Sequence, residues 1–206
     1  GFYGDYNGLP DLARSYREAF VRVGQYSPWR RCRYGREAGD SPASRFVVFA
    51  QDHDEAGNRP QGERLCALVG FEALKLAAAA VALSPYIPLL FMGEEYGEPA
   101  PFLYFTSHSD SRLAQAVREG RRKMFDSFPW PGAGAPDPNA AATFARCKLD
   151  HRLRRKGRHA RLRQFYRRLY ALRKEQPALA PRDRRNLDAE LHEEVRALLV
   201  RRRSGA

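Results

Sequence analysis

Two short runs of consecutive apolar residues predict strands. Residues 45–51 read RFVVFAQ and residues 87–92 read IPLLFM, and runs of this kind are typical of strands buried on both faces of a parallel sheet. Between them, the Ala/Leu-rich residues 65–84 predict one long helix that ends near Ser84–Pro85. The pattern therefore indicates a βαβ unit in which the helix is the crossover connection.

Helical spacing of apolar residues predicts three further helices. The first covers residues 9–24, with Gly24 as its stop, and the second begins at the N-cap Asp110 and covers residues 110–125. The third covers the Arg-rich residues 158–179, where apolar residues three and four positions apart predict a buried stripe. Its members are Leu162, Phe165, Tyr166, Leu169 and Leu172.

The remaining segments are read mainly as loops. Residues 25–44 and 129–139 are rich in Pro, Gly and Ser or Asn and predict irregular structure. Residues 194–205, EVRALLVRRRSG, predict a strand that begins a new structural unit.

Acidic residues follow both predicted buried strands. Asp52, His53, Asp54 and Glu55 come directly after the first, and Glu94–Glu95 come after the second. In a doubly wound sheet or an α/β barrel, active-site residues gather in loops at the carboxyl ends of the strands. No GxGxxG sequence follows either strand, so a dinucleotide site is not indicated.

The acids have three functional uses and one structural one. They could bind a metal, perform acid–base or nucleophilic chemistry, or accept hydrogen bonds from polyol hydroxyls. For four of them we expect a structural role instead, either capping the next helix or pairing with Arg59 and Arg64; these are Asp52, Glu63, Glu94 and Glu98. We expect His53 and Asp54 to point into the mouth of a sugar site. Six aromatic residues in the flanking loops could stack on sugar rings or simply pack: Tyr26, Trp29, Tyr96, Phe102, Tyr104 and Phe105.

Charge is distributed unevenly over the 206 residues. The net charge is +12, yet residues 1–145 hold 16 Lys/Arg and 17 Asp/Glu, so the excess lies in residues 146–206. A basic segment of this kind could bind nucleic acid. The apolar stripe instead favours an amphipathic helix that packs on a core and carries its arginines on the solvated outer face. No apolar run reaches the roughly 18 residues of a transmembrane helix, and we expect no secretory signal. Three well-separated cysteines fit a reducing, cytoplasmic setting without disulfides.

Several segments resemble the α-amylase superfamily of glycoside hydrolases. FVVFAQDHDEAGNR resembles the superfamily's last conserved region, and PYIPLLFMGEEYG resembles its eighth barrel strand. The flanking segments GNRPQGERL, PFLYFTSHSDSRLAQAVREGRRKMFDSF and GQYSPWRRCRYGR are similar to the malto-oligosyltrehalose trehalohydrolase family within it. The resemblance covers the chain from about Gly1 to Pro177.

The resemblance implies a retaining hydrolase that cleaves the α-1,4 bond next to the trehalose end of maltooligosyl trehalose. From the match of its position to the family motif, the resemblance implies that Asp54 is the carboxylate that stabilises the transition state. The implied substrate-binding residues are His53, Glu55, Asn58 and Arg59. The substrate is the α-glucan chain, and we expect no metal, no cofactor, no specific nucleic acid and no membrane partner. Asp52 and Glu55 depart from the Asn and Gln that the family usually carries at these positions.

The resemblance also implies an α/β fold that is the C-terminal part of a (β/α)8 TIM barrel. We expect residues 1–178 to hold about strands 7 and 8 with their helices, and residues 179–206 to hold a linker and the first strand of a truncated C-terminal β-sandwich. The nucleophile and the acid/base lie upstream of Gly1 in this family, so the fragment alone is expected to be inactive. Two alternatives stay open: a glycogen branching or debranching enzyme, and a non-catalytic basic binding module formed by residues 146–203.

Overall fold

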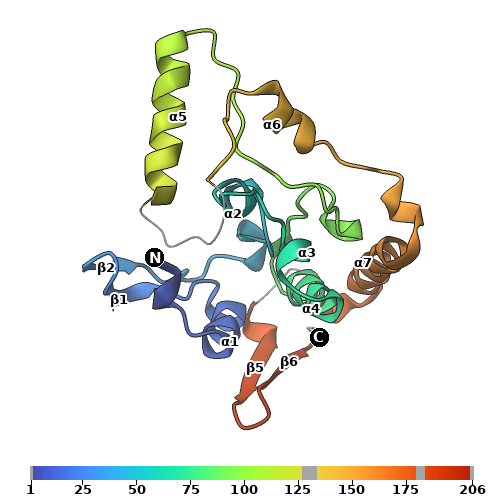
Figure 1. The fold of residues 1–206 in the computed structure, drawn as a ribbon. Coiled ribbons are helices and arrows are strands. Elements are labelled where there is room, and N and C mark those ends of the chain that lie inside the picture. The colour runs from blue at the N-terminus through green and yellow to red at the C-terminus, as the bar shows by residue number, and fades with distance from the viewer. Residues whose placement is uncertain (1, 127–133, 180–183, 205–206) are drawn as a thin grey trace. The chain divides into compact units, whose positions relative to one another are not determined.

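The computed structural model describes residues 2–126, 134–179 and 184–204, and Figure 1 shows its helices and strands in order along the chain. The residues form two compact units, and each unit is assembled from segments that are not contiguous in sequence. The first unit consists of Gly1–Val48, Ala80–Leu89 and Leu169–Ala206, and the second of Phe49–Ala79 and Leu90–Arg168.

A parallel strand pair lies in the first unit. β3 (Val47–Val48) pairs in parallel with β4 (Ile87–Pro88), and the Ile87 N–H donates to the Phe46 carbonyl at 2.9 Å. The connection between these strands contains α4 (Phe71–Ala82). The predicted βαβ unit is therefore confirmed.

The predicted burial of these strands is wrong for the described residues. Val47 is 55% exposed and Ile87 is 36% exposed, and each ladder strand is two residues long rather than the six or seven of its apolar run. The physical reason is the size of the sheet: β3 and β4 form a two-stranded sheet in the part of the chain that the structure describes. A parallel sheet needs covering layers on both faces to bury such side chains.

The first predicted helix is shorter than expected. α1 (Leu9–Glu18) ends where Ala19 adopts a positive φ of 68° and its N–H donates to the Ser15 carbonyl. Gly24, the predicted stop, lies instead within the following strand with a φ of 110°. The positive φ at Ala19 ends the helix before Gly24, because a right-handed helix needs a negative φ at every residue.

Two antiparallel hairpins are present that the sequence analysis did not predict; it predicted one of their four strands. β1 (Val23–Ser27) pairs with β2 (Cys32–Gly35); the first two residues of β1 fall in the predicted helix, and the rest of the hairpin falls in the stretch that was read as a loop. β5 (Leu187–His192) pairs along its length with β6 (Ala197–Arg202). The strand predicted within residues 194–205 is thus confirmed as β6. Its partner β5 was missed because its sequence, LDAELH, contains acidic and Ala residues that are depleted in strands.

The predicted helix over residues 65–84 is two helices. α3 (Leu65–Leu68) ends at Val69, whose backbone is extended, and α4 begins at Phe71. Gly70 lies between them. Gly70 is the local signal of this break, because Gly inside a helical pattern is unfavourable, and the continuous apolar run obscured it.

The helix predicted from Asp110 is confirmed. α5 (Ser111–Asp126) begins after Asp110, whose Oδ1 accepts from the backbone N–H groups of Arg112 at 2.8 Å and Leu113 at 3.3 Å. The carboxylate therefore satisfies donors that have no partner within the first turn.

The last predicted helix is also confirmed, and one helix before it was missed. α6 (Ala141–Arg146) precedes α7 (Gly157–Glu175), while part of the predicted loop, residues 129–133, lies outside the described residues. On α7, Leu162, Tyr166 and Leu169 are buried as predicted, and Phe165 is partly buried; Leu172, at 41% exposure, is not. The other elements are α2 (His53–Gly57) and the 3-10 turns Phe2–Asp5, Ala43–Arg45, Glu94–Tyr96, Leu153–Arg155, Pro177–Leu179 and Arg184–Asn186.

Arg173 connects distant segments of the first unit. Its guanidinium donates to the carbonyl of Ala82 at 2.7 Å, and to those of Ser84 and Tyr86 at 2.5 Å. Arg202 donates to the Ser84 carbonyl as well, at 3.1 Å. Partial burial lowers the pKa of Arg173, but the group remains charged because the ordinary value is above 12. These bonds satisfy carbonyls in the chain that leads from α4 into β4.

We predict that Arg173→Met lowers the free energy of unfolding by about 3 kcal/mol, because three carbonyls lose charge-assisted hydrogen bonds. Arg173→Lys should recover part of the loss, since one ammonium replaces a planar fork. Urea denaturation measures both, with the exposed Arg168→Met as control. A loss in Arg173→Met as small as in the control would contradict the prediction.

We also predict that the chain self-associates through the exposed apolar side chains beside β3 and β4, because unpaired strand edges are templates for pairing. Light scattering should show a mean mass that rises with concentration, and Val47→Lys should reduce the rise. Val195→Lys is the matched control, because Val195 is 68% exposed but lies in the turn between β5 and β6. Equal effects of the two substitutions would rule out association through β3.

Candidate functional site

The predicted site residues lie on α2 and the turn that follows it, and Asp52 is the N-cap of this helix. The Asp52 carboxylate accepts from the backbone N–H groups of Asp54 at 2.6 Å and Glu55 at 3.3 Å. The Glu55 carboxylate reaches back and accepts from the Asp52 N–H at 3.2 Å. This reciprocal arrangement is a capping box. The structural role predicted for Asp52 is confirmed.

The two capping carboxyls titrate at different pH. The hydrogen bond with the Glu55 side chain, helped by those from two backbone N–H groups, lowers the pKa of Asp52. Partial burial and the contact with Asp52 raise the pKa of Glu55. As the pH falls, Glu55 is therefore the first of the pair to take up a proton.

His53 and Asp54 are presented to solvent by the capped helix. Their side chains are 69% and 73% exposed, and His53 Nε2 lies 3.6 Å from Asp54 Oδ1. The imidazole can donate a hydrogen bond and the carboxylate can accept one. A neighbouring donor and acceptor of this kind match the hydroxyl groups of a sugar.

Asn58 and Arg59 lie directly after α2. Arg59 pairs with Glu63 at 3.3 Å, which confirms the pairing predicted for that acid. Asn58 is the C-cap of α2, and its side-chain oxygen accepts from Arg121 Nη1 at 2.8 Å; Arg121 Nη2 donates to the Gly57 carbonyl at 2.6 Å. Arg121 was not singled out from the sequence, because nothing distinguishes it from the other basic residues of its helix.

Two buried polar side chains, Gln51 and Glu94, lie in the second unit. Gln51, which is 6% exposed, accepts from the Leu65 N–H at 3.0 Å. Glu94 is 7% exposed, and its carboxylate accepts from the Tyr166 hydroxyl at 2.7 Å and from the Phe91 N–H at 3.2 Å. Burial raises the pKa of Glu94. This carboxyl is fixed by the protein and has little access to a substrate.

Glu98 is likewise structural. It is 1% exposed and accepts from the Tyr96 hydroxyl at 2.9 Å and from the backbone N–H groups of Ala100 and Asp150. Glu94 and Glu98 therefore have the structural roles predicted for them, although by a different means. Their partners are tyrosine hydroxyls and backbone amides rather than Arg59 or a helix to be capped.

Arg64 is buried in the same unit. It is 2% exposed, and its guanidinium donates to the carbonyls of Ala100 and Met92, each at 2.7 Å. The guanidinium also lies 4.7 Å from the centre of the Phe91 ring. Burial lowers the pKa of Arg64, and the negative charge of Glu98 opposes this shift. Arg64 thus attaches the loop after β4 to the start of α3.

The four loop aromatics of the second unit contact neighbouring side chains but differ in exposure, and Tyr104 at 40% and Phe105 at 36% are the exposed ones. Tyr96 is 1% exposed. Phe102 makes an edge contact with Phe105 at 5.9 Å between ring centres. Tyr104 lies under the Arg121 guanidinium at 4.3 Å. The other two predicted stacking residues belong to the first unit and are each 54% exposed: Tyr26 and Trp29.

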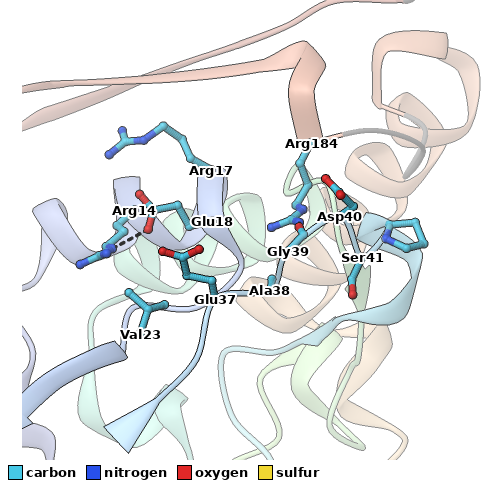
Figure 2. Close-up of a pocket in the computed structure, with 11 residues that line it drawn as sticks. Arg14, Arg17, Glu18, Val23, Glu37, Ala38, Gly39, Asp40, Ser41 and Arg184 are labelled. Carbon is cyan, nitrogen blue, oxygen red and sulfur yellow. Dashed lines mark hydrogen bonds and ion pairs between the residues drawn. The ribbon is translucent and has the colours of Figure 1, made fainter. Parts of the chain in front are cut away.

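A separate cavity of about 700 Å³ opens in the first unit. Figure 2 shows charged side chains of both signs around it, including the hydrogen-bonded pair Arg14 and Glu18. Its lining contains none of the five predicted site residues and no aromatic ring; it consists of Arg14, Arg17, Glu18, Val23, Glu37, Ala38, Gly39, Asp40, Ser41, Pro42 and Arg184. It offers no apolar platform for a sugar ring, so α2 remains the candidate site.

Over the described ranges, no group of three or more His, Cys, Asp or Glu side chains is arranged to hold a metal ion. Within the same part of the chain, no helix is both long and apolar enough to cross a membrane.

Comparison with known proteins places the chain in the α/β fold of the α-amylase type. A crystal structure from Salmonella typhimurium, named as an alpha amylase, superimposes with a TM-score of 0.83 at 40% identity, over 93% of this chain and 33% of that one. No protein-family model matches.

Curated relatives identify the family more narrowly than the fold does. The chain is 43% identical over 175 residues to malto-oligosyltrehalose trehalohydrolase of Saccharolobus solfataricus, which is 85% of this chain and 29% of the relative. It is 43% identical to that of Arthrobacter ramosus over 92% of this chain, and 38% identical to that of Mycobacterium tuberculosis H37Rv over 98%. The resemblance to malto-oligosyltrehalose trehalohydrolase is confirmed, and the chain spans about a third of the length of these relatives.

We predict a pH dependence of stability from Glu94. Its pKa in the folded protein is raised above the ordinary value of about 4.3, so the folded state binds the proton more tightly than the unfolded state. The contribution of Glu94 to stability is therefore fully present at pH values below about 4 and declines as the pH rises through the folded pKa.

Urea denaturation of the wild type and Glu94→Gln at several pH values measures this. The free energy of unfolding of the wild type, relative to that of Glu94→Gln, should fall as the pH rises. Tyr166→Phe should make the decline steeper, because it removes a donor to the ionised carboxylate. A wild-type advantage that grows with pH would show that the sign is wrong.

Proposed function

We propose that this chain supplies the transition-state-stabilising part of a retaining glycoside hydrolase that releases trehalose from maltooligosyl trehalose. The observation that carries the proposal is the solvent-exposed pair His53 and Asp54 on the capped helix that follows β3 in the chain. The chain matches trehalohydrolases along most of its length. The bond cleaved would be the α-1,4 link next to the trehalose end.

Asp54 fits the chemistry of this reaction. Glycoside cleavage passes through an oxocarbenium-like state, and hydrogen bonds to the 2-hydroxyl strengthen there. The exposed carboxylate of Asp54 is the acceptor for that hydroxyl, and the His53 imidazole donates to a neighbouring sugar oxygen. The capping box supports this role because it fixes the first turn of α2, from which both side chains project.

The other two carboxylates of the mechanism would come from the part of the relatives' length that this chain does not match. A retaining enzyme needs its nucleophile and its acid/base about 5–5.5 Å apart. Near Asp54, the carboxylates of Asp52 and Glu55 form the cap, and Glu63 pairs with Arg59. These acids are engaged in the structure, so the chain alone should not release trehalose.

The barrel assignment belongs to the same proposal. We infer that β3 and β4 are neighbouring strands of a (β/α)8 barrel, about its seventh and eighth, within residues 1–178. The β5–β6 hairpin would then begin a C-terminal β-sandwich within residues 179–206. The parallel register of β3 and β4 and the amylase-type fold support this arrangement.

A pair of isosteric substitutions tests the role of Asp54. In an enzyme that carries this chain together with the remaining part of a relative, Asp54→Asn should lower kcat about 30- to 1000-fold, which corresponds to about 2–4 kcal/mol of transition-state stabilisation. Asp52→Asn is the matched control, because Asn is an equally good N-cap, so most activity should remain. Trehalose released from maltooligosyl trehalose is the measured product.

Three results would overturn the proposal. One is near-normal turnover by Asp54→Asn. Another is trehalose release by the purified 206-residue chain. The third is transfer or debranching of amylose-type glucans without trehalose release, which would assign the site to a branching or debranching enzyme.

A further inference from the structure

Arg121 on α5 reaches the end of the helix that carries the candidate site. Its two terminal nitrogens donate in parallel, Nη2 to the Gly57 carbonyl at 2.6 Å and Nη1 to the Asn58 side-chain oxygen at 2.8 Å. Gly57 is the last residue of α2, and Asn58 is its C-cap. The first residues of the same five-residue helix are His53 and Asp54. One guanidinium thus fixes the helix at the end opposite to its capping box.

The guanidinium is itself held in place. It lies 4.3 Å from the centre of the Tyr104 ring and 4.9 Å from that of Phe125, which is 8% exposed. Burial lowers the pKa of Arg121. A planar group that stacks on rings and donates along one edge loses less freedom per hydrogen bond than a flexible ammonium would. Arg121 is therefore built as a fixed clamp.

The clamp determines which way the Asn58 amide faces. A guanidinium is a donor only, so the amide atom that faces Arg121 must be the oxygen. The NH2 group of Asn58 then lies on the other side of the amide and has two N–H groups to donate. Asn58 therefore presents donors at one end of α2, while Asp54 presents an acceptor at the other.

We propose that Arg121 is a positioning residue for the candidate site. It fixes the end of α2 and holds Asn58 as a hydrogen-bond donor to a hydroxyl oxygen of the glucose unit that Asp54 contacts. The donor role of Asn58 rests on the proposed function, whereas the clamp on α2 does not.

The chain offers a matched control on the same helix. Arg118 pairs with Asp137 at 2.9 Å, and that acid lies outside α2. Arg118→Met therefore removes an ion pair of α5, and Arg121→Met removes the clamp. Arg121→Lys keeps the charge but loses the planar fork.

Amide hydrogen exchange on the 206-residue chain tests the clamp. The reporter is the Asn58 backbone N–H, which donates to the Asp54 carbonyl at 3.1 Å. We expect exchange at this amide to be at least about tenfold faster in Arg121→Met, intermediate in Arg121→Lys and unchanged in Arg118→Met. Side-chain amide resonances of Asn58 should shift in Arg121→Met. Equal exchange in Arg121→Met and Arg118→Met would overturn the clamp.

Asn58→Asp tests the donor role without removing the clamp. The carboxylate still accepts from Arg121 but has no N–H to donate, so exchange at α2 should stay as slow as in the wild type. In the trehalose-release assay, kcat/KM should fall about tenfold, which is typical of one lost hydrogen bond. Unchanged kcat/KM would overturn the donor role.

The two parts of the proposal fail in different ways. If Asp54→Asn retains normal turnover, the proposed function fails, while the exchange result still decides whether Arg121 clamps α2. If exchange shows no clamp but Asp54→Asn is inactive, the proposed function stands and the positioning role is lost.

Discussion

The second unit depends on one buried cation. Arg64 follows the turn after α2, and its guanidinium bonds the carbonyls of Met92 and Ala100 in the loop after β4. Removing an arginine from water is costly, and the cost is offset only if its donors and its charge find partners. The two carbonyls satisfy Nε and Nη1, and the Phe91 ring and the charge of Glu98 offset the charge, whereas Nη2 is buried without a hydrogen-bond partner among the described residues. The same interaction that stabilises the unit therefore fixes the segment after α2 relative to the segment that follows β4.

Around this fixed frame, acidic residues divide into two groups by their exposure. Glu94 and Glu98 are buried and bind hydroxyl and amide donors, whereas Asp54 is exposed and projects from a short helix. Asp52 and Glu55 depart from the expected Asn and Gln, yet together they complete a capping box. The departures therefore keep a capped start of α2 and add negative charge beside Asp54.

The sequence was sufficient to predict features whose physical cause lies in neighbouring residues. The βαβ connection, the cap at Asp110 and the stripe of α7 follow from apolar periodicity and side-chain chemistry. It was insufficient where the cause is distant in the chain. Hairpin β5–β6 needs the partner of each strand to be known. Arg121 gains its importance only from Gly57 and Asn58, more than 60 positions earlier, and one arginine in a basic helix carries no mark of such a contact.

The segments of the two units alternate along the chain, and this alternation affects the order in which the units can fold. The first unit needs residues 1–48, 80–89 and everything from residue 169 onward, and Arg173 ties its last segment to the turn before β4. On the ribosome, the first unit therefore cannot close until its segment from residue 169 onward has been made, and by then every residue of the second unit has been synthesised. Contacts between such distant segments make folding slow, and the incomplete chain exposes its apolar strands during that interval.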